Sequence, residues 1–334
     1  MSGIDEIKDL FQTYSIELLA FLFIAVYSLN FWVGRSKNNG LAVSSLRKIN
    51  SILKEQFSEI GSYNPPRDDS LIKESNSRYL LYCSGRRNCN GLLVTINLQR
   101  RHDLFYVLMR YFKFSLEQDS ITIEISMSSS DYKEPLLFCV VERAQENELL
   151  ESMEDVKNHT NVYKCSKIPS DFHLRMEVPE MEGLVLDTLV AKTIQEHSKH
   201  ISYIHISDLA EQDKELGNRL LRFQIKIDES LDNSEALSRL TLMSCYLVDL
   251  ISGLKLHAQT KKIIESKRLR VKEALFKASH KEREEASQRL KEEKLQKELE
   301  SRQGLSKAAI MKREEKLRRR QMKKNGGKTM VCFV

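Results

Sequence analysis

The sequence predicts an α+β cytosolic globular domain with one N-terminal transmembrane helix and a long charged C-terminal helical tail. Three observations predict it: an apolar stretch near the start, alternating apolar runs through the middle, and a basic end without proline. The parts expected, in chain order, are a short lumenal N-terminus (1–15), a transmembrane helix (16–34), a juxtamembrane helix and linker (35–74), the α+β domain (75–256), a charged helical or coiled-coil tail (257–325) and a flexible C-terminus (326–334).

The apolar stretch at 16–33 contains no charged side chain after Glu17. Its 16 uninterrupted residues form about 24 Å of helix, which suits an endoplasmic reticulum bilayer of about 27 Å once the helix ends are included. A cleaved signal peptide and a buried core helix are the alternatives, and the first lacks a basic start and a small-residue cleavage site. The residues expected to anchor the chain in the lipid bilayer are Leu18, Phe21, Phe23 and Trp32.

The charges around this stretch predict its orientation. Acidic residues dominate before it, whereas Arg35 and Lys37 follow it. By the positive-inside rule, residues 1–15 lie in the lumen and the chain from about Gly34 onward lies in the cytosol. We therefore expect a single-pass protein of the endoplasmic reticulum membrane with a lumenal N-terminus and a cytosolic C-terminus.

The middle of the chain alternates short apolar runs with helical patterns, as one folded α+β domain does. Residues 121, 123 and 125 are all Ile, an alternation that indicates a strand with one covered face. A juxtamembrane helix is expected at 41–60, before an exposed linker at 62–77. The strands expected are 79–83, 92–98, 121–127, 136–141, 174–178, 201–206 and 220–227, and the helices expected in the domain are 103–112, 145–159, 182–199 and 234–256.

A search for catalytic motifs finds no nucleophile elbow, Walker loop, zinc-protease motif or dinucleotide fingerprint. The six cysteines fall on the predicted cytosolic side, where disulfides are not expected. Cys83 and Cys89 lack a matching downstream His or Cys pair for a zinc site. The chain is therefore predicted to be no enzyme and to use no cofactor or metal.

The C-terminal tail is the most asymmetric part of the sequence. Residues 261–328 hold 24 Lys or Arg against 11 Glu and no Asp, and no proline follows Pro179. This composition favours a long helix, but its leucines form only a broken heptad stripe, so a stable homodimeric coiled coil is not expected. Gly304 and Ser306 predict a break in the helix, as a stop and a new N-cap.

Beyond that break the charge is almost wholly positive. Such a cluster can neutralise nucleic-acid phosphates with release of counterions, without reading base sequence. The plainer interpretation is a solvated helix whose charges keep it soluble, although the excess of one sign argues against it. The residues expected to bind nucleic-acid phosphates, those of RNA in particular, are Lys312, Arg313, Lys316, Arg318, Arg319, Arg320, Lys323 and Lys324.

Several short segments together resemble one known family. The residues that carry the likeness are Cys83, Ser84, Gly85, Arg86, Cys89 and Gly91, then Asp103, then Asp208, and finally Phe276, His280, Arg283 and Arg289 near the start of the tail. In this order they are similar to the calumin family, the coiled-coil subunit of the PAT complex in the endoplasmic reticulum multi-pass translocon. The likeness runs from about residue 20 to residue 324.

This resemblance implies a non-enzymatic subunit of an intramembrane chaperone complex that binds translating ribosomes. The partners it implies are the ribosome, the protein-conducting channel, the small membrane subunit Asterix and nascent multi-pass membrane proteins. Family members in animals carry a long acidic lumenal segment linked to calcium, whereas only about 15 residues precede the span here. Asp5, Glu6 and Asp9 cannot supply the six to eight oxygen ligands that calcium takes.

Two other functions stay open. One is a membrane-anchored structural tether whose basic tail binds anionic lipid or a partner protein. The other is a factor in calcium homeostasis of the endoplasmic reticulum. Preference of the tail for anionic liposomes over ribosomes would distinguish the tether from the ribosome-binding subunit.

Overall fold

A computed structural model describes residues 14–61, 71–112, 114, 117–127, 134–209, 219–227 and 235–303. The chain forms two compact units, residues 1–268 and residues 269–334. The first unit combines helices with one antiparallel sheet. This confirms the predicted mixture of helix and strand.

The sheet contains ten strands in the order β1-β3-β4-β5-β10-β9-β6-β8-β7, with β2 paired to β3. Each pairing is antiparallel. All of the strands predicted from the sequence are confirmed, with ends shifted by three residues or fewer, whereas β1, β2 and β7 were not predicted. The strands are β1 (Glu59–Ile60), β2 (Ile72–Lys73), β3 (Arg78–Ser84), β4 (Cys89–Asn97), β5 (Ser120–Met127), β6 (Leu137–Glu142), β7 (Asn161–Tyr163), β8 (Phe172–Met176), β9 (Ile201–Ser207) and β10 (Leu220–Lys226).

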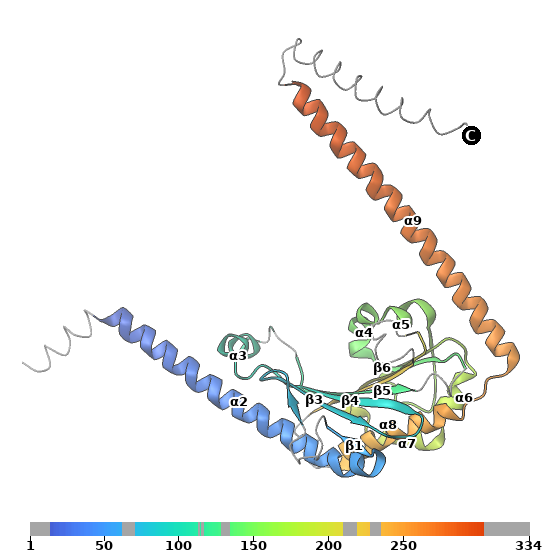
Figure 1. Cartoon of the computed structure of the whole chain (residues 1–334), viewed down its shortest axis with the longest axis horizontal. Coiled ribbons are helices and arrows are strands. Elements are labelled where there is room, and N and C mark those ends of the chain that lie inside the picture. The colour runs from blue at the N-terminus through green and yellow to red at the C-terminus, as the bar shows by residue number, and fades with distance from the viewer. Residues whose placement is uncertain are drawn as a thin grey trace, which may run out of the picture. The chain divides into compact units, whose positions relative to one another are not determined.

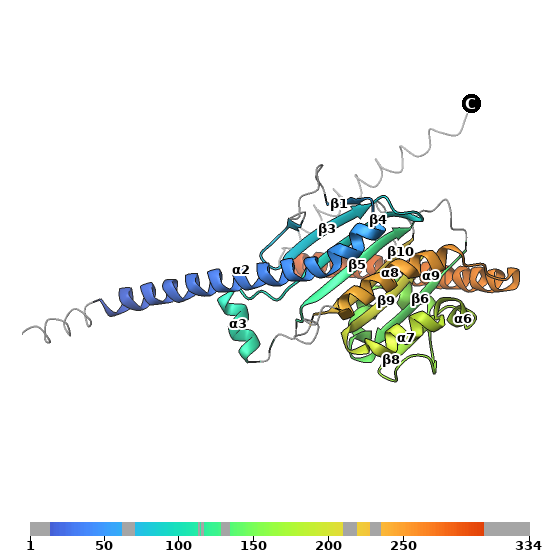
Figure 2. The same cartoon turned by 90° about the horizontal axis from the view of Figure 1, so that it is seen from below.

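One face of the sheet is apolar and is covered by helices. On β5, Ile121, Ile123 and Ile125 are buried in the main core, and Thr122 and Glu124 belong to the opposite face. The helices on the apolar face are the C-terminal part of α2 (Ser15–Gln56), α6 (Met181–Val185), α7 (Thr188–Glu196) and α8 (Glu235–Ser252). Figure 2 shows α2, α7 and α8 lying across this face.

The opposite face carries polar side chains and two short helices, α4 (Glu146–Ser152) and α5 (Glu154–His159) (Figure 1). Glu146 on α4 accepts a hydrogen bond from Arg175 on β8 at 2.6 Å. On α5, the Oδ2 atom of Asp155 lies 2.9 Å from the Nε2 atom of His205 on β9. These polar pairs, together with a small apolar cluster of Leu149, Met153 and Val156 with Cys139 and Val141 of β6, fix both helices on the sheet.

Two predicted helices are interrupted in the structure. The one expected at 145–159 divides into α4 and α5 at Met153, where the backbone is extended with φ −120° and ψ 92°. The one expected at 182–199 divides at Leu186, which is also not helical. Met153 and Leu186 are buried, so each helix breaks where the chain turns an apolar side chain into the core.

The predicted transmembrane and juxtamembrane helices form a single helix, α2, which ends at Gln56. Its apolar N-terminal part is exposed, and its length and composition suggest a single-pass membrane protein. Its later turns bury one face in the core through Ala42, Leu46, Ile49 and Leu53, at helical spacing. The N-terminal part of α2 is therefore apolar and exposed, whereas its C-terminal part packs into the hydrophobic core of the domain.

The tail begins as α9 (Ala258–Gln303). Its first three turns, to Arg268, belong to the first unit, and the remainder belongs to the second. In the second unit, the side chains described between Leu269 and Glu292 are exposed except for the half-buried Val271. The predicted break at Gly304 lies outside the described residues.

Candidate functional site

The first turns of α9 are attached to one edge of the sheet by charged side chains. Because β8 and β9 both run antiparallel to β6, their carboxyl ends meet at the same edge. Glu177 directly follows β8, and Asp208 directly follows β9. Two carboxylates from distant parts of the sequence are thereby brought together.

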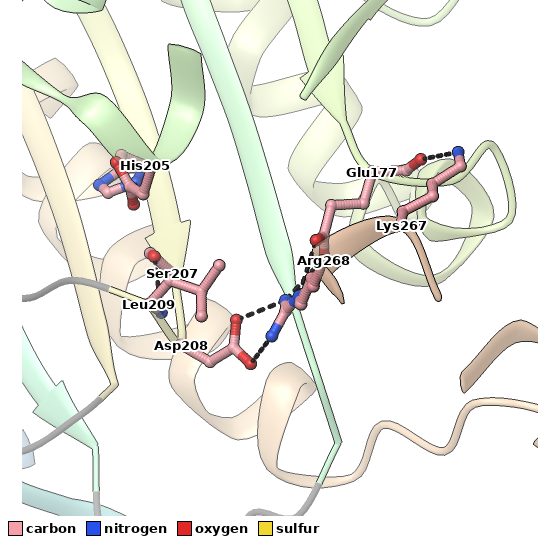
Figure 3. A network of polar contacts seen from close by, with 8 residues as sticks. Glu177, His205, Ser207, Asp208, Leu209, Lys267 and Arg268 are labelled. Atoms are coloured by element: carbon pink, nitrogen blue, oxygen red, sulfur yellow. Dashed lines mark hydrogen bonds and ion pairs between the residues drawn. The ribbon is translucent and has the colours of Figure 1, made fainter. Parts of the chain in front are cut away.

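Arg268 of α9 lies between these two carboxylates (Figure 3). Its guanidinium donates to both oxygens of Glu177 at 2.7 Å and to the oxygens of Asp208 at 2.7 and 2.8 Å. The Glu177 side chain is only 1% exposed, so Arg268 supplies the opposite charge that a buried carboxylate requires. Burial alone would lower the pKa of Arg268, but the hydrogen bonds to Glu177 and Asp208 raise it, and the guanidinium stays charged.

Other residues of the same helix face extend this attachment. Ile264 is fully buried in the main core. Lys261 donates to Glu134 at 2.6 Å, Lys267 donates to the carbonyl of Glu177 at 2.8 Å, and Thr260 bonds Glu180. Ile264 follows Thr260 by four residues, and Lys267 and Arg268 follow Ile264 by three and four, which places all of them on one side of a helix.

The turn between β3 and β4 holds a second group of the family-like residues. Gly85 has φ +83°, and a side chain there would collide with Ser58 just after α2. Arg86 reaches back to bond Gln56 of α2, Asp249 of α8 and the Cys245 carbonyl. This turn therefore joins the end of α2 to α8 and the sheet.

Cys83, Ser84, Cys89 and Gly91 lie on the strands that flank this turn. Ser84 donates to Glu59 of β1 at 2.9 Å. Burial raises the pKa of Cys83 to about 12 and that of Cys89 to about 11. Both side chains are therefore neutral thiols at neutral pH and poor nucleophiles.

Beside Arg86, α7 and α8 form a groove of about 510 Å³. Its lining is mainly apolar and includes the half-exposed Leu189 and Leu242. Lys192, Glu196 and Arg239 stand at its polar rim. An apolar groove with a few polar groups at its margin has the general character of a binding surface.

A third group fixes the loop before α3 (Leu104–Tyr111) on α2. Asn38 of α2 is fully buried and donates to the carbonyls of Asn76 and Gln99, each at 2.9 Å. Arg101 donates to Asn38 at 3.1 Å and forms an ion pair with Asp119. Asp103 caps α3 by accepting from the Phe105 amide at 3.0 Å.

The remaining predicted residues belong to none of these three groups. Phe276, His280, Arg283 and Arg289 are exposed along α9 in the second unit. Leu18, Phe21, Phe23 and Trp32 are exposed on the apolar part of α2. The eight basic residues from Lys312 to Lys324 lie outside the described residues, as do Asp5, Glu6 and Asp9.

The family resemblance singles out Asp208, whereas sequence analysis missed its neighbours Glu177 and Arg268. Glu177 carried a usable signal, because it is an acid inside a predicted apolar strand at 174–178. Arg268 carried none, since it is one basic residue among many in the tail. Within the described ranges, no group of three or more His, Cys, Asp or Glu side chains is arranged to hold a metal ion.

Comparison with known proteins matches nearly the whole chain to one family. The family model described as PAT complex subunit CCDC47 matches residues 13–324. The PAT complex subunit CCDC47 of Xenopus laevis is 26% identical over 309 residues, which cover 86% of this chain and 63% of the relative. That of Homo sapiens is 25% identical over 311 residues, covering 86% and 64%. An uncharacterized protein of Arabidopsis thaliana is 28% identical over 271 residues, covering 77% and 55%. The chain thus spans less than two thirds of the length of these relatives.

Proposed function

The chain belongs to the PAT complex subunit CCDC47 family, and from this membership we propose that it is a ribosome-binding subunit of an endoplasmic reticulum PAT complex. It is a non-enzymatic subunit that sits beside the protein-conducting channel and pairs with the small membrane subunit Asterix. The complex assists insertion and folding of multi-pass membrane proteins as an intramembrane chaperone. The single observation that supports this most is the family match over 13–324, which includes the apolar helix, the sheet domain and the tail.

The membrane helix itself contributes little to shielding immature helices. A client helix with polar groups needs hydrogen-bond partners inside the bilayer. Only Ser28 and Asn30 are polar between Leu18 and Val33, apart from Tyr27, and Asn30 already donates to the Arg101 carbonyl at 3.3 Å. Shielding therefore belongs mainly to the membrane partner, and this chain anchors and positions it.

The tail supplies the ribosome contact in this proposal. From Leu269 to Glu292 the described side chains of α9 are exposed except for the half-buried Val271, so the basic side chains of this stretch can meet an anionic surface. The strongest positive cluster follows at Lys312–Lys324. Contact with phosphates of ribosomal RNA requires this end of the chain to be cytosolic, with residues 1–15 on the lumenal side.

The test is co-sedimentation with ribosomes from mildly solubilised membranes across a salt series. One variant replaces Lys312, Arg313, Lys316 and Arg318 by Gln, and a second replaces Arg319, Arg320, Lys323 and Lys324 by Gln. The matched control replaces four exposed basic residues of the first unit by Gln, namely Arg87, Lys164, Lys192 and Lys199.

Each tail variant should pellet less and show a shallower dependence of binding on salt, because fewer counterions are released. The control should pellet like the unmodified chain. An unchanged salt slope in both tail variants would refute the role of the tail. Binding of the tail to anionic liposomes but not to ribosomes would instead favour the structural tether.

A further inference from the structure

Helix α3 presents its apolar side chains outward. Phe105 is 66% exposed, Leu108 is 53% exposed and Phe112, at its end, is 58% exposed. Their spacing of three and four residues puts them on one side of the helix. Phe114 beyond the helix is also exposed. None of the residues of α3 itself is buried, so this cluster serves no core.

A polar contact of α3 lies on another side of the helix. Arg110 donates to the side chain of Gln99 at 2.5 Å, in the loop that leads to the helix. An ordinary surface helix directs its apolar stripe to the core and its charges to water. In α3 the apolar side chains of Phe105, Leu108 and Phe112 are exposed beside the equally exposed Arg110, so the helix offers apolar surface to an environment outside the protein.

The position of α3 identifies that environment. The loop before it lies against α2 at the end of the apolar stretch (Figure 1). The ring of His102 packs edge-on against Phe31 with centroids 5.9 Å apart, and Asn30 donates to the Arg101 carbonyl at 3.3 Å. Gly34 is buried under the same loop, where a Cβ atom would collide with the backbone of Arg101.

Trp32 lies on α2 between these contacts and is 77% exposed. Tryptophan at the end of an apolar span marks the boundary between acyl chains and headgroups. The exposed Arg35, Lys37 and Arg100 follow at the same level and suit the phosphates of lipid headgroups. The apolar cluster of α3 is therefore held beside α2 at the level of this boundary.

We propose that α3 lies in the interfacial layer of the bilayer, with Phe105, Leu108 and Phe112 among the upper acyl chains. A helix of two turns would bind a membrane weakly by itself. Here α2 already fixes it at the surface, so little further freedom is lost on insertion. The inference rests on the membrane anchoring in the proposed function and not on the ribosome contact.

The experiment measures quenching of tryptophan fluorescence by brominated phospholipids in proteoliposomes that contain only the full chain. The native chain has one tryptophan, Trp32, which reports whether the anchor is in lipid. In a Trp32→Phe background, three separate chains carry Phe105→Trp, Leu108→Trp or Phe112→Trp. A fourth carries Tyr82→Trp, an exposed position near the C-terminal end of α2, about 30 Å along that helix from Gly34.

The three α3 reporters should be quenched as strongly as Trp32, and more by lipids brominated near the headgroup than by lipids brominated near the chain end. The Tyr82→Trp reporter should be insensitive to both. Quenching of Trp32 with α3 reporters as insensitive as Tyr82→Trp would overturn the inference, leave the anchor standing and assign the cluster to a protein partner. Absence of quenching at Trp32 and on α3 alike would overturn the anchor together with the inference.

Discussion

A single side chain, Arg268, attaches the first turns of α9 to the ends of β8 and β9. It is 18% exposed and neutralises two carboxylates, of which Glu177 is almost fully buried and Asp208 is 13% exposed. The pairing joins the ends of two strands to a helix that is distant in sequence. A buried pair of this kind contributes little net free energy when intact, but losing one partner leaves an uncompensated charge.

Replacing Arg268 by Met should lower the free energy of unfolding by about 3 to 5 kcal/mol, because Glu177 would stay buried without a cation. Adding Glu177→Gln and Asp208→Asn to this variant should recover part of the loss. Arg270→Met, at an exposed position two residues on, is the matched control. Chemical unfolding in detergent measures the three values, and equal effects of Arg268→Met and Arg270→Met would show that the network is unimportant.

Asp155 on α5 gives the domain a dependence on acid. Burial alone would raise the pKa of Asp155, but the hydrogen bond from His205 and its charge outweigh burial, and hold that pKa at about 2. The unfolded carboxyl titrates near its usual value of 3.8. The ionised group therefore stabilises the fold above about pH 4, and this stabilisation is lost as the pH falls toward about 2.

We expect Asp155→Asn to remove about 2 kcal/mol of stability at neutral pH and to flatten the loss of stability in that acidic window. Glu154→Gln, at the exposed neighbouring position on the same helix, should keep the full acid dependence. Unfolding midpoints measured at several pH values between about 5 and 2 compare the two variants. Parallel pH profiles for Asp155→Asn and the unmodified chain would contradict the assignment.

At the scale of elements, the sequence pattern located the strands well and the helix ends poorly. Alternation such as Ile121, Ile123 and Ile125 is local and survives folding unchanged. The interruptions at Met153 and Leu186 depend instead on what the core accepts, which no local pattern encodes. The strands β1, β2 and β7 contain two or three residues each, too short for any period to show.

Helix α2 contains two glycines that differ in what surrounds them. A Cβ atom at Gly34 would meet the backbone of Arg101 and His102, whereas at Gly40 nothing lies within 4 Å. Alanine favours a helix over glycine by about 1 kcal/mol when its environment is open. The two positions therefore form a natural pair of test and control.

Gly34→Ala should displace the loop before α3 from α2, while Gly40→Ala should leave it in place and slightly stabilise the helix. Hydrogen exchange of the peptides covering residues 98–112, measured in nanodiscs, reports the attachment of the loop. Exchange should accelerate in the first variant only. The same exchange rate in both variants would mean that the close approach at Gly34 does not hold the loop.

At the scale of the whole molecule, the family expected from the sequence is confirmed, and so is the mixture of helices and sheet. The turn at Gly85 and the helix cap at Asp103 could be predicted from the sequence, because each depends on residues that are adjacent in the chain. The partners of Asp208 and Arg86 could not be foreseen, since they join residues 60 and 163 positions apart. The basic cluster from Lys312 to Lys324 stays a prediction.

The division between the two units predicts where the chain can be shortened. A chain ending at Arg270 keeps Ile264 and Arg268, so it should unfold at the same temperature as the full chain. A chain ending at Gln259 loses both and should unfold at a lower temperature, because it exposes core surface and leaves Glu177 unpaired. Differential scanning fluorimetry measures both, and equal midpoints for the two shortened chains would contradict this division.

Because α2 is one continuous helix, a tilt of its membrane-spanning part also moves its C-terminal end. Twenty-two residues separate Gly34 from Gln56, and they span roughly 33 Å of helix without a hinge. If the thickness of the bilayer changes the tilt of the span by about 10°, the far end of this helix moves sideways by about 6 Å. The sheet, which buries that end in its core, must travel with it. Membrane thickness would thus be converted into displacement of the whole domain parallel to the membrane surface.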